Sequence, residues 1–257
     1  MIEVSTFFVE THTHLDLIKR NAEEVIKEAV KNKVTKMINI GIDLPSSQIA
    51  IEFALRFKEV YAAIGYHPNE SNLINEQEWK DLEKLACHEK VVAIGETGLD
   101  YYRRRSTIRQ QVIAFKKHLV LARKFNLPVI VHDRDAHKDI LKILKDEATG
   151  LKIVVHCFSG DMDMARECMD EGYYIGIGGV VTFKNAKSLQ SITKEYPLDK
   201  ILLETDSPFL APHPFRGKPN EPKYIPLIAE KISELKGISL EKVADVTSGN
   251  CKTVFGI

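Results

Sequence analysis

The sequence has little cysteine, no excess of charge of either sign and no long apolar run. Only 4 of its 257 residues are cysteines, too few for a disulfide framework, and no CxxC pair suggests a zinc knuckle or a redox site. The 36 lysine and arginine residues balance 36 aspartate and glutamate residues, which excludes a globally basic nucleic-acid-binding protein. A local basic patch stays possible. We expect reduced thiols in a cytoplasmic protein.

Other absences limit the class of protein further. No window approaches about 18 consecutive apolar residues, so no transmembrane helix is expected. The first segment, MIEVSTFFVETHTH, lacks the pattern of a signal peptide and is predicted to contain a strand. No Gly/Ser linker or low-complexity tract divides the chain, which predicts a single domain over residues 1–257.

The sequence does contain a repeated pattern, in which a short apolar, β-branched run precedes an amphipathic segment of helical length. The eight runs are residues 7–14, 36–42, 60–67, 91–96, 128–132, 152–156, 173–178 and 200–206. Near-continuous apolar runs suit a parallel sheet that is covered on both faces. The pattern predicts an α/β fold, a (β/α)8 TIM-type barrel. An open doubly wound sheet is the alternative, but no glycine-rich nucleotide-binding motif supports it.

The segments between the runs have helix signals. Asn21 is a plausible N-cap with Glu24 three residues later, and a helix in 106–126 ends before Pro128. Four large or titratable residues fall in such helices, and we expect them to have no catalytic role. These are Trp79, His88, His118 and His137.

Most of the predicted strands end in a residue that can bind a metal or titrate. In chain order these residues are His12 and His14, His67, Glu96, His132, His156 and Asp206. On a (β/α)8 barrel they all lie at the C-terminal mouth, where active sites of this fold are found. A single strand-end histidine is more often a surface residue, but this many at one end predict a metal site.

The spacing in the first strand supports the metal site. Side chains alternate across a strand, so His12 and His14 point to the same side. Two imidazoles on one face can grip a divalent cation of the zinc or manganese type.

Seven motifs in this order resemble a known family. They are ETHTHLD (10–16), GYHP (65–68), GETGLDYY (95–102), VHDRDA (131–136), HCFSG (156–160), ETDSPFLAP (204–212) and RGKPNEP (216–222). Together they resemble the TatD family of metal-dependent deoxyribonucleases, which belongs to the amidohydrolase-type metal-dependent barrels. The resemblance covers nearly the whole chain.

The resemblance implies two divalent metal ions, with zinc, manganese, magnesium and nickel all possible. The metal ligands that it implies are His12, His14, Glu96, His132, His156 and Asp206. Glu96 then matches the residue that bridges two metals, and His67 matches a histidine near the substrate. Two positions depart from the family pattern: Glu10 stands where the family usually has Asp, and Asp133 where a small residue is common. Glu10 could change the surroundings of the ligands and the metal preference.

Charge considerations support phosphodiester chemistry independently. With two divalent cations, two carboxylates and neutral histidines, the site keeps a charge of about +2, which suits an anionic phosphate. The metals would lower the pKa of a water molecule, and Asp206 could take its proton. We therefore expect Asp206, Glu96 and His67 to act in catalysis.

Cationic and aromatic residues follow the ligands in the mouth loops. Arg103 begins a run of three arginines just after Tyr101 and Tyr102, Arg134 follows His132, and Arg216 follows Asp206. Guanidinium groups suit phosphate oxygens, and aromatic faces suit unpaired bases. We expect Arg134, Arg216 and Arg103 to contact the substrate.

The leading hypothesis is a nuclease acting on DNA, as a 3′–5′ exonuclease on single strands, because a narrow mouth admits a strand end more easily than a duplex. A second hypothesis is an amidohydrolase that opens a cyclic amide. Such barrels often carry a carbamylated lysine that bridges two metals at the fourth strand. Here the fourth strand ends in Glu96 with no lysine nearby, which argues against this hypothesis. A non-catalytic metal-binding interaction barrel is a third. DNA or RNA, exonuclease or endonuclease, and a monomer or a weak homo-oligomer are all compatible with the sequence.

Overall fold

Eight parallel strands pair in the order in which they occur along the chain, in a computed structural model that describes residues 6–257. The strands are β1 (Phe8–Thr13), β2 (Val34–Ile40), β3 (Val60–Ile64), β4 (Val91–Asp100), β5 (Val129–Arg134), β6 (Ile153–Val155), β7 (Tyr174–Ile177) and β8 (Ile201–Leu203). The first and last strands meet through a parallel bridge between Thr13 and Ser207, where the His14 N–H donates to the Ser207 carbonyl at 2.9 Å. The predicted (β/α)8 barrel is confirmed. Residues 1–5 of the predicted domain lie outside the described residues.

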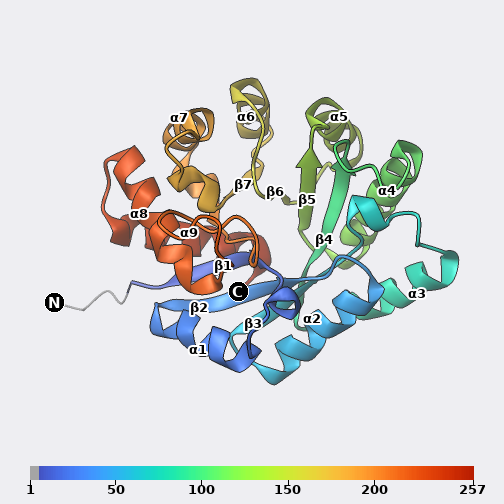
Figure 1. Cartoon of the computed structure of the whole chain (residues 1–257). Coiled ribbons are helices and arrows are strands. Elements are labelled where there is room, and N and C mark those ends of the chain that lie inside the picture. The colour runs from blue at the N-terminus through green and yellow to red at the C-terminus, as the bar shows by residue number, and fades with distance from the viewer. Residues whose placement is uncertain (1–5) are drawn as a thin grey trace.

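Helices alternate with the strands and surround them (Figure 1). They are α1 (Ala22–Lys31), α2 (Leu44–Arg56), α3 (Glu76–Leu85), α4 (Ile108–Phe125), α5 (His137–Glu147), α6 (Met162–Asp170), α7 (Lys187–Glu195), α8 (Ile225–Lys236) and α9 (Leu240–Phe255). The Asn21 side chain accepts from the first-turn N–H groups of α1, as an N-cap does. Helix α4 is capped by Asn126, whose backbone has the left-handed conformation and which stands two residues before Pro128.

Most strands end one or more residues away from the predicted position, and β1 and β6 stop just before His14 and His156. Strand β4 continues past Glu96 to Asp100, because its last residues still pair with β5, up to Asp100 opposite Arg134. Strands β3 and β8 stop before His67 and Asp206, which stand in the loops that follow. The Asp206 N–H donates to the His12 carbonyl at 2.8 Å, so this loop residue is still anchored to β1.

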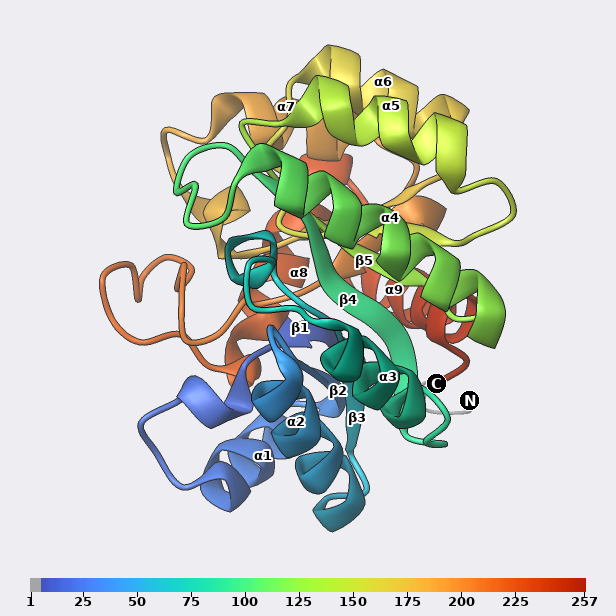
Figure 2. The same cartoon turned by 90° about the vertical axis from the view of Figure 1, so that its right-hand side faces the viewer.

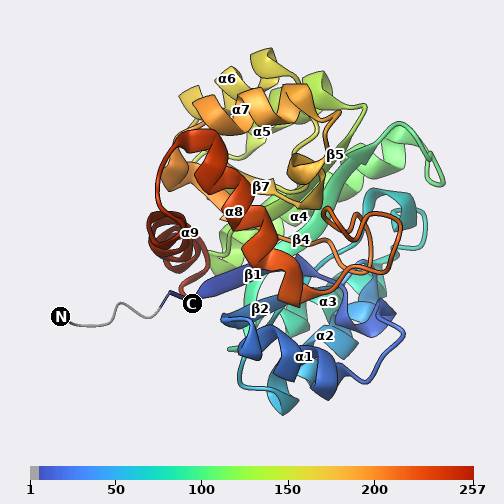
Figure 3. The same ribbon diagram turned by 60° about the vertical axis from the view of Figure 1, so that its left-hand side comes forward.

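The hydrophobic core has two parts, one between strands and helices and one inside the barrel. Inside, apolar strand residues such as Val9 and Ile130 contact Cys251, Val254 and Phe255 of α9. This helix therefore closes the N-terminal end of the barrel by burying apolar surface. In Figure 2 the loops after β3, β4 and β8 project on the side opposite α9, and Figure 3 shows the same separation. The open end is the C-terminal mouth.

The four cysteines are free thiols. Cys168 and Cys251 are buried, Cys157 is partly buried and Cys87 is exposed. Among residues 6–257, every helix is too short or too polar to cross a membrane.

His118 of α4 is a buried structural residue that supports the mouth. The Tyr66 N–H donates to Nε2 at 3.1 Å, and Nδ1 lies 2.8 Å from the Ala114 carbonyl, which it can reach only as a donor. This pattern needs the neutral imidazole, and burial lowers the pKa of His118 to about 4. His118 thereby holds the residue that precedes His67.

The low pKa of His118 predicts a loss of stability in acid. In the unfolded chain the imidazole takes up a proton near pH 6.5, whereas in the folded chain it stays neutral down to about pH 4. Stability is therefore complete above pH 6.5 and falls as the pH drops toward 4, by about 2 kcal/mol between pH 7 and pH 5. Urea unfolding of the wild type and of His118→Gln at both pH values measures this. We expect a smaller decrease in the variant, and equal decreases would contradict the assignment.

Candidate metal centre

The mouth contains a cleft of about 360 Å³ in which most of the predicted site residues come together. Its lining includes His14, His67, Glu96, His132, His156 and Asp206. His12 is fully buried, and its ring packs against the rings of His14 and His156. The strand-end pattern thus brings all seven predicted side chains into one cluster.

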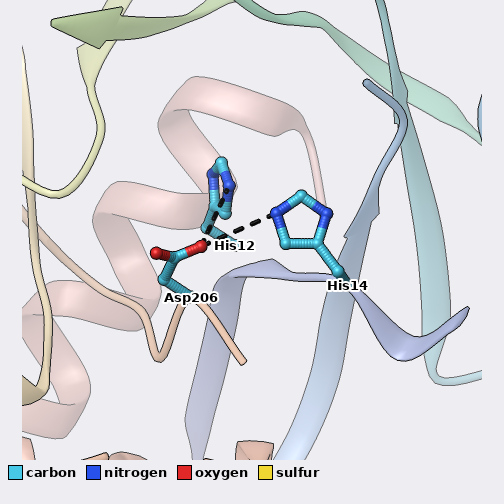
Figure 4. A group of neighbouring side chains, drawn as sticks. All are labelled: His12, His14 and Asp206. Carbon is cyan, nitrogen blue, oxygen red and sulfur yellow. Dashed lines mark ion pairs between the residues drawn. The ribbon is translucent and has the colours of Figure 1, made fainter. Parts of the chain in front are cut away.

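The first group of ligand atoms belongs to His12, His14 and Asp206 (Figure 4). His14 Nε2 lies 3.6 Å and His12 Nε2 3.9 Å from Asp206 Oδ1, so both imidazoles converge on one carboxylate oxygen. His14 Nδ1 lies 3.1 Å from the Ile40 carbonyl, a contact that orients the ring with Nε2 toward the cleft.

The second group belongs to Glu96, His132 and His156. Glu96 Oε1 lies 2.6 Å from His132 Nδ1 and 3.0 Å from His156 Nε2. The other oxygen, Oε2, lies 3.5 Å from His12 Nε2, which is part of the first group. The Glu96 carboxylate therefore stands between the two groups and presents one oxygen to each.

Unpaired buried nitrogens show that these residues fit a cation. Within residues 6–257, His12 Nδ1 and Nε2 and His132 Nε2 are buried without a hydrogen-bond partner. A buried polar atom without a partner is costly, and a metal ion would satisfy the lone pair of a neutral imidazole. Imidazole and carboxylate donors within 4.8 Å of one another are the donor set that a divalent transition metal prefers.

The carboxylates and imidazoles of the site shift each other's pKa values. Burial alone would raise the pKa of Glu96, but the imidazoles of His156 and His67 hold it well below its usual range. Burial would also raise the pKa of Asp206, but contacts with histidines, chiefly His14, lower it below its usual value. The pKa of His156 is raised well above its usual value, because Glu96 and Glu204 outweigh the desolvation. Protons on the imidazoles must leave when a cation binds, so metal affinity falls with decreasing pH.

Two buried carboxylates in the site were not predicted from the sequence. Asp100 Oδ2 lies 3.5 Å from His132 Nε2, and Glu204 Oε1 lies 3.5 Å from His156 Nδ1. Both stand at a strand end, like the predicted ligands, and this was the signal that could have identified them. Contacts with His132 keep the pKa of Asp100 below its usual value despite its burial, so it adds a negative charge. With two divalent cations, Asp100 lowers the predicted charge from about +2 to about +1, and Glu204, whose negative charge acts on His156, lowers it further.

The two departures from the family pattern have structural roles. Glu10 is fully buried, and its Oε1 accepts from the N–H groups of His12 and Thr205, each at 2.9 Å. It therefore joins the backbones that carry His12 and Asp206. Asp133 is buried, and its Oδ2 lies 2.7 Å from Nδ1 of His137, which ties the end of β5 to α5.

The predicted arginines occupy different places at the mouth. Arg103 and Arg134 line the cleft, together with Arg105. The Arg134 guanidinium also covers the Tyr102 ring, 4.5 Å from its centroid. Arg216 lies in the loop after β8, with its guanidinium 4.3 Å from the centre of the Phe183 ring.

Comparisons with known proteins extend this description. The TatD related DNase family matches residues 9–256. The chain is 44% identical to the uncharacterized metal-dependent hydrolase YabD of Bacillus subtilis, over 96% of this chain and 98% of that protein. It is 33% identical to the 3′-5′ ssDNA/RNA exonuclease TatD of Salmonella typhimurium, over 93% of this chain and 94% of that protein.

A solved structure has the same fold. The crystal structure of YJJV, a TatD homologue from Escherichia coli, has a TM-score of 0.91 and 30% sequence identity, covering 97% of this chain and 98% of that chain. A family match along nearly the whole barrel agrees with a mouth that is rich in side chains able to bind a metal. The chain belongs to the TatD-related DNase family and is a metal-dependent hydrolase.

Proposed function

We propose that this hydrolase cleaves phosphodiester bonds at single-stranded DNA ends, from 3′ to 5′, with two divalent metal ions. The observation that carries the proposal is the position of Glu96, whose two oxygens face two different groups of ligands. A carboxylate in that position can hold two cations side by side, an arrangement suited to displacement at phosphorus. The mixed imidazole and carboxylate donors suit zinc, manganese, nickel or magnesium.

The ligand roles follow from the two groups. In this proposal His12, His14 and Asp206 hold one cation, His132 and His156 hold the other, and Glu96 bridges them. When bound, the cations supply positive charge for the phosphate and lower the pKa of a water molecule.

Two further roles belong to Asp206 and His67. The Asp206 side chain is 17% exposed, so it reaches the cleft. Its lowered pKa keeps the carboxylate ionised, the form that can accept a proton from water. Burial lowers the pKa of His67 to about 4, so this imidazole is neutral at pH 7. Its Nδ1 accepts from the Asn69 N–H at 3.0 Å, which places the proton on Nε2, next to the Glu96 carboxylate. We assign this N–H to a hydrogen bond with the substrate.

The substrate class rests on the shape and charge of the mouth. Arg103 and Arg134 line a cleft of about 360 Å³, which suits the end of a single strand better than a duplex. We assign phosphate contacts to these two arginines and to Arg216. The activity named for the Salmonella relative supports the same class of substrate. We further propose that the protein works in the cytoplasm, where its free thiols stay reduced, as a monomer or a weak homo-oligomer.

A comparison of three substrates tests this function. The metal-free protein is supplied in turn with each divalent cation and assayed on single-stranded DNA, a chromogenic phosphodiester and a cyclic amide. The proposal expects metal-dependent shortening of DNA from the 3′ end and hydrolysis of the phosphodiester. Hydrolysis of the amide alone would assign an amidohydrolase, and metal binding without any turnover would assign an interaction module.

Substituting Arg134 or Arg216 tests the phosphate contacts. Each alanine variant should bind single-stranded DNA more weakly, and each lost contact should reduce the slope of log affinity against log salt by roughly 0.7. A small phosphodiester that reaches only the metals should be affected less, because it lacks the remote contacts. An unchanged salt slope would exclude contact with the backbone, whereas equal losses on both substrates would place these arginines at the reacting phosphate or in the fold.

A further inference from the structure

An apolar wall forms one side of the cleft that contains the candidate metal-binding groups. Leu17, Phe209 and Leu210 line the cleft, and these residues are 41%, 51% and 43% exposed. Leu17 ends the short 3-10 helix (Leu15–Leu17) after β1, and the other two residues follow β8. Large apolar side chains gathered in a cleft indicate a ligand whose surface is partly apolar.

The opposite side of the same cleft carries three arginines, of which Arg105 pairs with Glu70 of the lining at 3.7 Å. Arg103 and Arg105 follow β4, and Arg134 ends β5. Strands β4 and β5 stand half-way around the barrel from β8 and β1, so the ligand groups lie between the two walls. A ligand that fills this cleft has an anionic part near β4 and β5 and an apolar part near β8 and β1.

The backbone that carries Phe209 is held in place although its ring is exposed. The side-chain amide of Asn220, which is fully buried, donates to the carbonyls of Phe209 and Thr205 at 2.7 and 2.8 Å. The Phe209 N–H donates to the Asp206 carbonyl at 2.8 Å. The ring centre lies 6.3 Å from that of His14, in an edge-on arrangement. The ring is therefore positioned beside a predicted metal ligand by a fixed turn.

Phe209 also differs from the aromatic residues that the sequence indicated. Arg134 covers the Tyr102 ring, and the Tyr101 hydroxyl donates to Asp139 at 2.6 Å. Phe209 instead lines the cleft itself. It is the better surface for a planar group.

We propose that the wall of Leu17, Phe209 and Leu210 binds the base of the terminal nucleotide of a single strand, stacked on the Phe209 ring. This inference rests on the proposed function, and it adds the site that reads the unpaired end. With the base on this wall, the phosphate of the same nucleotide reaches the ligand groups and the next phosphates face the arginines. A base that is still paired in a duplex does not offer its face, so the site selects single strands. Stacking on an aromatic ring tolerates any base.

The test compares two single strands that are otherwise identical. In one strand the first and the last nucleotide carry natural bases, and in the other strand these two nucleotides carry no base. We expect the wild type to cleave the natural strand with a kcat/KM at least about fivefold higher, as stacking on one aromatic residue provides. In Phe209→Ala this ratio should fall toward one, and in Phe209→Trp it should persist. Phe7→Ala is the matched control, because Phe7 is an exposed aromatic residue just before β1, at the other end of the barrel. An unchanged ratio in Phe209→Ala overturns the inference.

A binding measurement separates this inference from the nuclease assignment. A strand that ends in the fluorescent base 2-aminopurine is mixed with metal-free protein, and stacking lowers the fluorescence in the wild type but not in Phe209→Ala. Cleavage of the same strand is measured separately, after a divalent cation is added. Lowered fluorescence in the metal-free protein, without any cleavage after the cation is added, would keep the base site and reject DNA hydrolysis. Cleavage with unchanged fluorescence would keep the nuclease and reject the base site. Neither binding nor cleavage would reject both.

Discussion

Replacing Glu96 with alanine is expected to abolish hydrolysis and leave the barrel folded. Glu96 is the carboxylate shared by the two groups of ligands, so its loss removes an oxygen from each. The expected decrease in kcat is at least about 10³-fold, because the charge stabilisation that depends on a positioned metal site is lost. The barrel persists because its core is formed by apolar strand and helix residues, to which this side chain adds little.

Three measurements check this expectation. Circular dichroism reports the fold, elemental analysis reports the metal content, and turnover is measured on single-stranded DNA at saturating metal. Glu147→Ala is the matched control, because this half-exposed glutamate pairs with a surface lysine, Lys116, and such pairs contribute little. Turnover near that of the wild type in Glu96→Ala would overturn the bridging role.

Replacing Asp206 with asparagine is expected to lower the rate by at least about 10²-fold, the range usual for general-base and electrostatic contributions. The substitution preserves size and the turn after β8 but removes the negative charge that faces His12 and His14. It also removes the group assigned to accept a proton from water.

The rate is measured with increasing metal, so that weaker binding is separated from slower chemistry. Recovery at high metal would make Asp206 a ligand only, whereas a loss that persists supports a second role as a base. A loss below tenfold at saturating metal would exclude both roles. Asp163→Asn, at an exposed aspartate in the first turn of α6, is the control and should leave the rate unchanged.

The mouth illustrates why some features can be predicted from sequence and others cannot. His12 and His14 could be placed on one face because alternation along a strand is a local property of the backbone. The order of strands in a (β/α)8 barrel then places all strand ends at one mouth, without knowledge of any side-chain contact. The same reasoning extends to Asp100 and Glu204, which also end strands, but nothing local distinguished them from surface carboxylates.

The sequence by itself therefore determined the barrel, the end at which the site lies and the identity of seven of its metal-capable side chains, but not of Asp100 and Glu204. Only the tertiary structure decided that Glu96 directs one oxygen to each group of ligands, that Arg216 lies against Phe183, and that Phe209 faces the cleft. The physical reason is that these arrangements depend on contacts between residues far apart in the chain. The turn that carries Phe209 is held by Asn220, and the orientation of Glu96 depends on histidines of β1, of β5 and of the loop after β6. Local periodicity carries no information about such contacts.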